Sequence, residues 1–271
     1  MKLEDLTKQQ IVLLTLLISF VTSIATGITT VALVEQAPPA VSQTINRVIQ
    51  KTIESVVPGQ NGPQTVIVKE EDLVVDAIDR NAASLVAIKE DVSGGAGILL
   101  GTGFLVSKNG MVITDNRIAI EKGNYTIVLN GVSYPAEFLS NDPRGFSILR
   151  ALPFKDPITG AFKSFDFSSF GNSDALKVGL TVVAPSTLDG ESLNVAKGII
   201  SRLTAEPATD NALAKVTGIT LTMSLGRANS GSPLLNTDGE VIGLVLVKDG
   251  NTVIIPSNVL GDAINKINSG N

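Results

Sequence analysis

The stretch "RANSGSPLLNTDGEVIGLVLV", residues 227–247, places a serine among small residues just ahead of an apolar strand. Ser230 is followed by Gly231 and Ser232, then by Pro-Leu-Leu, an Asp-Gly turn and an apolar run that ends at Val247. The pattern is typical of a nucleophilic serine. A serine hydroxyl is a poor nucleophile until an adjacent base accepts its proton, and the chain contains no histidine, the commonest general base. The surrounding sequence must therefore show whether Ser230 can act.

Composition limits the possible functions. The 271 residues suffice for one large domain or two small ones with a sizeable core. Short runs of Val, Ile and Leu, with only 4% aromatic residues, favour strands over a helical bundle. A net charge of −5 without a basic block argues against nucleic-acid binding. Because Cys and His are absent and no Asp-x-Asp-x-Asp-Gly loop occurs, we expect no disulfide, no metal and no cofactor.

The N-terminal segment Ile11–Val34, "IVLLTLLISFVTSIATGITTVALV", carries no charge and is long enough to span a bilayer. It exceeds the roughly 7–15 apolar residues typical of a signal peptide, which remains the alternative. Lys2 and Lys8 precede the segment, whereas Glu35 follows it. The positive-inside rule therefore predicts a cytoplasmic N-terminus (residues 1–10) and a single-pass anchor in the cell membrane, with the remainder of the chain extracytoplasmic.

Residues 35–57 are predicted to form a short helical stalk. Apolar or small side chains recur there at a spacing of three or four residues, which indicates one helical face: Val41, Ile45, Val48, Thr52 and Val56. The stripe fits a coiled coil that would make the protein a homo-oligomer. It fits equally an amphipathic helix that lies on the membrane or on the following domain, because about two heptads are too few to decide. Residues 58–69, with "PGQNGPQ", are a linker by composition.

Residues 70–271 are predicted to form one β-rich domain. A short helix, "EEDLVVDAIDRN", is followed by short apolar runs separated by turns, and "SNVLGDAINKI" returns to helical spacing near the end. Asn109-Gly110, Asn130-Gly131 and Asp249-Gly250 have the chemistry of tight hairpin turns. Many strands without alternating long helices predict an antiparallel barrel or sandwich.

Residues from about 72 to 267 resemble the protease domain of the HtrA/DegP-type trypsin-like serine proteases. "GTGFLVSKNGMVITDNRIAI" is similar to the family's G-S-G-F segment that ends in T-N-x-H-V-V, and "NDPRGFSILRA" to its D-P-x-x-D-L-A-V-L-K segment, one residue shorter. "ANSGSPLLNTDGEVIGL" is similar to G-N-S-G-G-P-L-L-N followed by G-x-V-I-G. The matches follow one another in the family's order. The resemblance implies an all-β fold of two perpendicular six-stranded antiparallel barrels with the active cleft between them.

The same resemblance places the catalytic triad on three residues of this chain. Ser230 matches the nucleophile, Arg117 stands at the position of the histidine, and Gly145, or its neighbour Arg144 if the deletion is placed differently, stands at that of the aspartate. An arginine is charged at physiological pH and cannot accept a proton. Loss of the base of such a triad typically costs about 10⁶-fold in rate. We therefore predict a pseudoprotease.

The oxyanion hole would use the amides of Ala228 and Ser230. The family has glycine where this chain has Ala228, which carries a steric cost if the position needs a positive φ. Each residue also has a purely structural interpretation. Ser230 can be a small residue that lets a tight turn pack, and Arg117 can form a surface ion pair with Asp115 or Asp142, which contributes only about 0–1 kcal/mol.

Two functions follow, and they belong to different classes. The first is a membrane-tethered module that binds a peptide or protein partner in the former substrate cleft. The alternative is a serine endopeptidase in which Ser230 uses a non-standard base such as Lys122 or Lys197. A third possibility is that the barrels only space a partner from the membrane. A deprotonated lysine or an aligned carboxylate within bonding reach of the Ser230 oxygen would reverse the prediction of inactivity.

Two further expectations come from the resemblance. Relatives usually carry a PDZ domain after the protease domain, whereas this sequence reaches Asn271 without one. Partner rules that depend on PDZ recognition are therefore not carried over. If only base and acid are missing, Arg117→His combined with Gly145→Asp should restore some peptidase activity.

Overall fold

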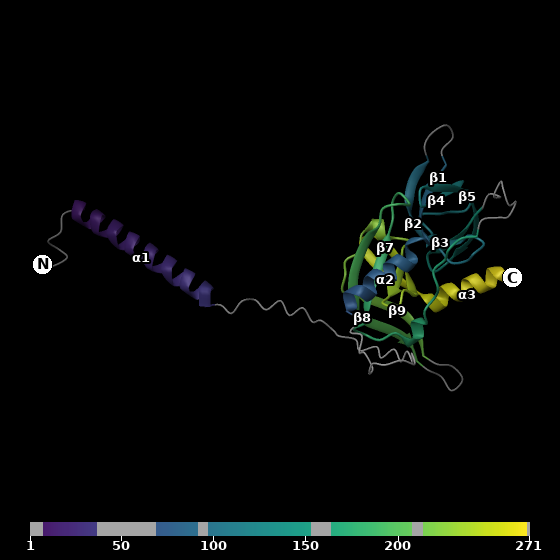
Figure 1. The fold of residues 1–271 in the computed structure, drawn as a ribbon. Coiled ribbons are helices and arrows are strands. Elements are labelled where there is room, and N and C mark those ends of the chain that lie inside the picture. Colours follow the sequence, from purple (N-terminus) through teal and green to yellow (C-terminus); the bar gives the residue numbers. More distant parts are fainter. Residues whose placement is uncertain (1–7, 37–68, 92–96, 153–163, 208–213, 270–271) are drawn as a thin grey trace, which may run out of the picture. The chain divides into compact units, whose positions relative to one another are not determined.

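The computed structural model describes residues 8–36, 69–91, 97–152, 164–207 and 214–269 (Figure 1). The chain divides into two compact units, Met1–Asn46 and Arg47–Asn271. Nearly all of the predicted stalk (35–57) and linker (58–69) lies outside the described residues.

Helix α1, Lys8–Gln36, contains the predicted membrane segment and extends a few residues beyond it at both ends. Its stretch Lys8–Ile28 has a mean hydropathy of 2.3, so the helix is long and apolar enough to cross a membrane. The hydroxyls of Thr15 and Thr22 donate to the carbonyls of Ile11 and Ile18, at 2.8 and 2.9 Å. These polar side chains are therefore satisfied within the helix, as a bilayer interior requires.

The first described helix of the second unit is α2 (Glu70–Ala82), whose first turn holds three acidic residues that favour a helix N-terminus. Six antiparallel strands then form a closed barrel in the order β1-β2-β3-β6-β5-β4. Their bounds are β1 Leu85–Glu90, β2 Ile98–Leu105, β3 Met111–Asp115, β4 Tyr125–Leu129, β5 Val132–Asp142 and β6 Phe146–Ala151. The predicted turn between β4 and β5 is confirmed, since Asn130 and Gly131 both have positive φ, 49° and 74°.

Six further antiparallel strands form a second sheet in the order β12-β11-β10-β7-β8-β9, and its edge strands β12 and β9 contact each other. Their bounds are β7 Thr181–Ser186, β8 Asn194–Glu206, β9 Lys215–Leu221, β10 Pro233–Asn236, β11 Val241–Lys248 and β12 Asn251–Pro256. The 3₁₀ turns η2 (Ser173–Ala175) and η3 (Arg227–Asn229) and helix α3 (Ser257–Asn268) complete the unit. The predicted all-β fold of two six-stranded barrels is confirmed.

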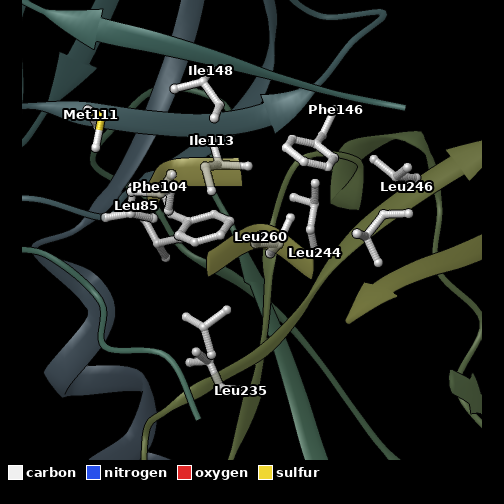
Figure 2. Close-up of a cluster of buried hydrophobic side chains, with 14 of the residues drawn as sticks. Leu85, Phe104, Met111, Ile113, Phe146, Ile148, Leu235, Leu244, Leu246 and Leu260 are labelled. Carbon is white, nitrogen blue, oxygen red and sulfur yellow. The ribbon is translucent and has the colours of Figure 1, made fainter. Parts of the chain in front are cut away.

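One hydrophobic cluster joins the two barrels (Figure 2). Ile113 and Phe146 of the first barrel face Leu244 of β11 and Leu260 of α3, and all four side chains are buried. Full burial of such a side chain contributes about 1.5–3 kcal/mol. The shared cluster therefore holds the end of β3 firmly against β10 and β11, where the candidate site lies.

Candidate functional site

Ser230 lies in a tight turn between η3 and β10 and is 5% exposed. The turn passes very close to β2, because a Cβ at Gly231 would lie 2.0 Å from the carbonyl oxygen of Thr102. Gly231 also has a φ of +87°, which side-chain-bearing residues rarely adopt. Only glycine therefore lets the chain present Ser230 at this point between the barrels.

Arg117 reaches the same point from the end of β3. The last residue of that strand, Asp115, accepts the backbone N–H of Arg117 on Oδ1 at 2.8 Å and its Nε at 3.0 Å. Nη2 of Arg117 also donates to Oδ2 of Asp115. The carboxylate is buried, whereas the arginine side chain is 43% exposed. The turn is therefore rigid, because the Asp115 carboxylate binds both the backbone and the guanidinium of Arg117.

The two turns meet in what we call the Ser230 cluster, formed by Ser230, Asp115, Arg117 and Val247. Ser230 Oγ donates to Oδ2 of Asp115 at 2.5 Å and accepts the backbone N–H of Val247 at 2.8 Å. Nη2 of Arg117 lies 3.4 Å from Ser230 Oγ and donates to the carbonyl of Val247 at 2.7 Å. Among the described residues, the serine hydroxyl is therefore in contact with Asp115, Arg117 and Val247.

The expectation that nothing beside Ser230 could receive its proton is wrong, because Asp115 is bonded to that hydroxyl. A carboxylate thus lies within the bonding reach named above as grounds for reversing the prediction of inactivity. Whether Ser230 is active therefore depends on how well Asp115 accepts a proton. The sequence predicts for Asp115 only a surface ion pair with Arg117, whereas the pair is centred on a buried carboxylate. The signal for it was present in "VITDNR", where an acidic residue ends a strand of apolar residues just before the position of the base. The contact itself joins residues far apart in the sequence.

The electrostatics of the cluster make Asp115 a weak base. Burial on its own raises the pKa of the Asp115 carboxyl, but hydrogen bonds from Arg117 and Ser230 outweigh it and leave the pKa below its ordinary value. The hydrogen bond to Asp115 raises the pKa of Arg117 further. A general base is most effective when its pKa lies near the working pH. At neutral pH, Asp115 is therefore ionised and accepts the serine proton poorly.

One of the two predicted oxyanion donors, the Ser230 N–H, is occupied within the turn. The Ser230 N–H donates to the carbonyl of Arg227 at 3.1 Å, and the Asn229 N–H donates to that of Gly226 at 2.9 Å. Ala228 lies inside the resulting 3₁₀ turn, without the positive φ that a glycine would favour. An oxyanion hole requires N–H groups aimed at the developing charge. Here one of them is already paired with a carbonyl oxygen.

Gly145 lies near Arg117, as the alignment of motifs predicts, because its carbonyl accepts the N–H of Asn116 at 3.0 Å. Its φ is +111°, and a Cβ there would lie 3.0 Å from Cδ1 of Leu246. An aspartate at this position would therefore be strained. We now expect Arg117→His with Gly145→Asp to lower stability rather than to restore activity.

The other candidate residues do not reach Ser230. The alternative acid position, Arg144, pairs with Asp142 at 2.8 Å and lies over the ring of Phe146. Lys197 lies 3.4 Å from Glu70, and Lys122 lines a surface pocket beside β5. Among the residues that the structure describes, no group of three or more carboxylates could hold a metal.

Comparisons with known proteins agree with this fold. The sequence profile of the family described as "Trypsin-like peptidase domain" matches residues 101–244, more than half of the chain. A protein of Chlamydia pneumoniae named "Probable periplasmic serine endoprotease DegP-like" is 35% identical over 146 residues, which cover 53% of this chain and 28% of the relative. A protein of the same name from Marinomonas sp. (strain MWYL1) is 30% identical over 179 residues, 63% of this chain and 36% of the relative.

The chain thus spans about a third of these relatives' length. Among solved structures, "HtrA-type protease AlgW with decapeptide" superposes with a TM-score of 0.57 at 18% identity and covers 72% of this chain and 67% of the other. That likeness shows the fold alone. With the profile match, the two barrels and the serine turn between them, the chain belongs to the trypsin-like peptidase domain family.

Proposed function

We propose that this chain is a membrane-anchored, trypsin-fold protein that binds polypeptide without cleaving it. One observation carries the proposal: the proton of Ser230 is donated to Asp115, a carboxylate that Arg117 already neutralises and whose pKa is lowered. The nucleophile position is occupied, but the group beside it is poorly suited to remove its proton at neutral pH.

The energetic consequence is large. Loss of an effective base in a serine triad typically slows the reaction about 10⁶-fold, or roughly 8 kcal/mol of barrier. What remains in such enzymes comes from the oxyanion hole and from binding. The Ser230 amide is paired with Arg227, so this residual contribution is also reduced. Two independent parts of the catalytic apparatus are therefore compromised.

Binding is supported by what the chain retains. Both barrels, the shared core and the serine turn are formed although the base and acid positions are substituted. The protease AlgW was solved with a decapeptide, and the DegP-like relatives are named as periplasmic. By analogy, this chain would hold an extended polypeptide on the extracytoplasmic side of the membrane, with α1 as its anchor and residues 1–10 in the cytoplasm.

The test of inactivity is labelling of the detergent-solubilised full chain with a fluorophosphonate probe, together with incubation with β-casein. We expect no adduct at Ser230 and no cleavage, with results identical to those of Ser230→Ala. A stoichiometric adduct that disappears in Ser230→Ala would overturn the proposal. The proposed binding is tested separately: we expect the immobilised chain to retain unfolded β-casein.

A second function is favoured by the 2.5 Å contact between Ser230 and Asp115. In a serine hydrolase that used it, Asp115 would take the hydroxyl proton as Oγ bonded the acyl carbon of the substrate, and would return that proton to the amine as the peptide C–N bond broke. Asp115→Asn separates the two functions. Loss of fluorophosphonate reactivity in Asp115→Asn, from a wild type that reacts, would support the hydrolase.

A further inference from the structure

Strand β11 presents two main-chain groups at an open edge. Val245 donates its N–H to the carbonyl of Ser232 at 2.9 Å and accepts the N–H of Gly231 at 2.8 Å, so both of its groups face β10. In a strand this direction repeats at every second residue. Val247 therefore faces the same side, but β10 begins only at Pro233 and the chain has turned away by Ser230. Among the described residues, no strand lies beside the next main-chain position along this edge, that of Val247.

Two side chains occupy that position instead. The hydroxyl of Ser230 accepts the Val247 N–H at 2.8 Å, and Nη2 of Arg117 donates to the Val247 carbonyl at 2.7 Å. Arg117 is fixed there by Asp115, which holds both Nε and Nη2. Val247 and Ser230 are 4% and 5% exposed, whereas the Arg117 side chain that covers them is 43% exposed. The guanidinium lies on the solvent side of this position, so its displacement breaks hydrogen bonds to Asp115 and Val247 rather than buried apolar contacts.

We infer that Arg117 is an autoinhibitory plug: it fills the place on β11 where the main chain of an extended polypeptide would pair. Extended segments add to free strand edges through main-chain hydrogen bonds, and proteins commonly block such edges. The inference rests on the proposed polypeptide binding and adds its regulation. In the resting state the edge is closed, and a bound strand replaces Arg117 at the Val247 carbonyl.

Arg144 provides a control, because it has the same charge and side-chain length as Arg117. Arg144 forms the same local pair with Asp142, with Nε to Oδ1 and Nη2 to Oδ2 both at 2.8 Å. It lies over Phe146 rather than over a strand edge. Arg144→Ala thus removes an equal charge from the same barrel without opening β11.

The experiment measures binding of a fluorescein-labelled decapeptide of alternating valine and threonine to the full chain in detergent micelles, by fluorescence anisotropy. We expect Arg117→Ala to lower the dissociation constant about two- to tenfold, which one new main-chain hydrogen bond to the Val247 carbonyl can supply. Arg144→Ala should leave it unchanged.

Because Arg117→Ala leaves a buried carboxylate without its cation, Asp115→Asn with Arg117→Ala serves as a second open variant that removes both charges. Equal affinity of the wild type and both open variants, including no binding by any of them, would overturn the plug. If all bind equally, polypeptide binding itself stands and lies elsewhere on the surface. Cleavage of the peptide by the wild type would count against the proposed function, whereas the plug is judged only from the affinity ratio.

Discussion

Two turns in the first barrel have the same local chemistry and opposite surroundings. After β3, Arg117 donates its N–H and Nε to Oδ1 of Asp115 and its Nη2 to Oδ2. At the end of β5, Arg144 makes the same three contacts with Asp142. The Asp115 side chain is 1% exposed and bonds to Ser230, whereas that of Asp142 is 17% exposed. An identical Asp-x-Arg turn is therefore part of a buried cluster in one place and a surface ion pair in the other.

The comparison shows that burial, rather than the pair itself, decides what such a turn contributes. A solvent-exposed pair typically contributes about 0–1 kcal/mol. Removal of one partner from a buried, hydrogen-bonded charge pair leaves the other group unpaired and costs about 3–5 kcal/mol. Asp115 holds Arg117 on one side and Ser230 on the other, so it links the end of the first barrel to the turn before β10.

The largest expected effect is the difference in stability lost when Asp115 or Asp142 is replaced by alanine. Asp115→Ala should lower the free energy of unfolding by about 3 kcal/mol, because Arg117 and the Ser230 hydroxyl both lose their acceptor. Asp142→Ala should lower it by less than about 1 kcal/mol. Urea unfolding followed by the fluorescence of Tyr125 and Tyr134, both buried in the first barrel, measures the difference. Equal losses in the two variants would contradict the distinction drawn from burial.

A smaller loss of stability is expected when Ser230 is replaced. This serine bonds to Asp115 and, among the described residues, has no counterpart in the turn of Asp142. Ser230→Ala should cost about 1–2 kcal/mol, since the carboxylate loses one donor and the buried Val247 N–H loses its acceptor. Ser201, an exposed serine on β8 that bonds to Thr220, provides the control. Ser201→Ala should stay within about 0.5 kcal/mol. A Ser230→Ala variant as stable as Ser201→Ala would mean that the hydroxyl serves catalysis or binding alone.

The smallest expected effect is the change with pH in the stability that Asp115 and Asp142 contribute. The pKa of Asp115 is lowered in the folded chain from an ordinary value of 3.8, so the unfolded chain binds its proton first as the pH falls. Its contribution is complete well above pH 3.8 and disappears as the pH falls through the folded value. The stability gap between the wild type and Asp115→Asn should therefore narrow between pH 6 and pH 3. Asp142, whose pKa Arg144 also lowers, should show a weaker trend in Asp142→Asn because it is partly exposed.

Urea unfolding at several pH values between 6 and 3, in constant salt, measures the difference in the free energy of unfolding between the wild type and each of the two variants. A gap for Asp115→Asn that stays constant over this range would show that the carboxylate is not the stabilising form.

Much of the fold follows from local sequence patterns. Asn130-Gly131 and Asp249-Gly250 predict hairpins because these residues tolerate positive φ, and the structure has all four at positive φ. The apolar run from Ile11 predicts a long helix because nothing in it is charged or breaks a helix. Ser230, Arg117 and Gly145 were also predicted to lie near one another, through the order of motifs along the chain.

The environment of the serine could not be predicted in the same way. "TDNR" and "DPR" both place an aspartate two residues before an arginine, and nothing within either segment distinguishes them. Burial of Asp115 depends on β10, β11 and the shared core of the two barrels, contributed by residues more than a hundred positions away. Its pKa depends in turn on that burial.

By itself, then, the sequence determined the apolar helix, the hairpins and the small-residue turn at Ser230, because each rests on the conformations of a few neighbouring residues. Only the tertiary structure decided that the hydroxyl meets a carboxylate and that an arginine covers the free edge of β11. Hydrogen-bond partners and desolvation are set by which distant surfaces pack together, and that is a property of the whole fold.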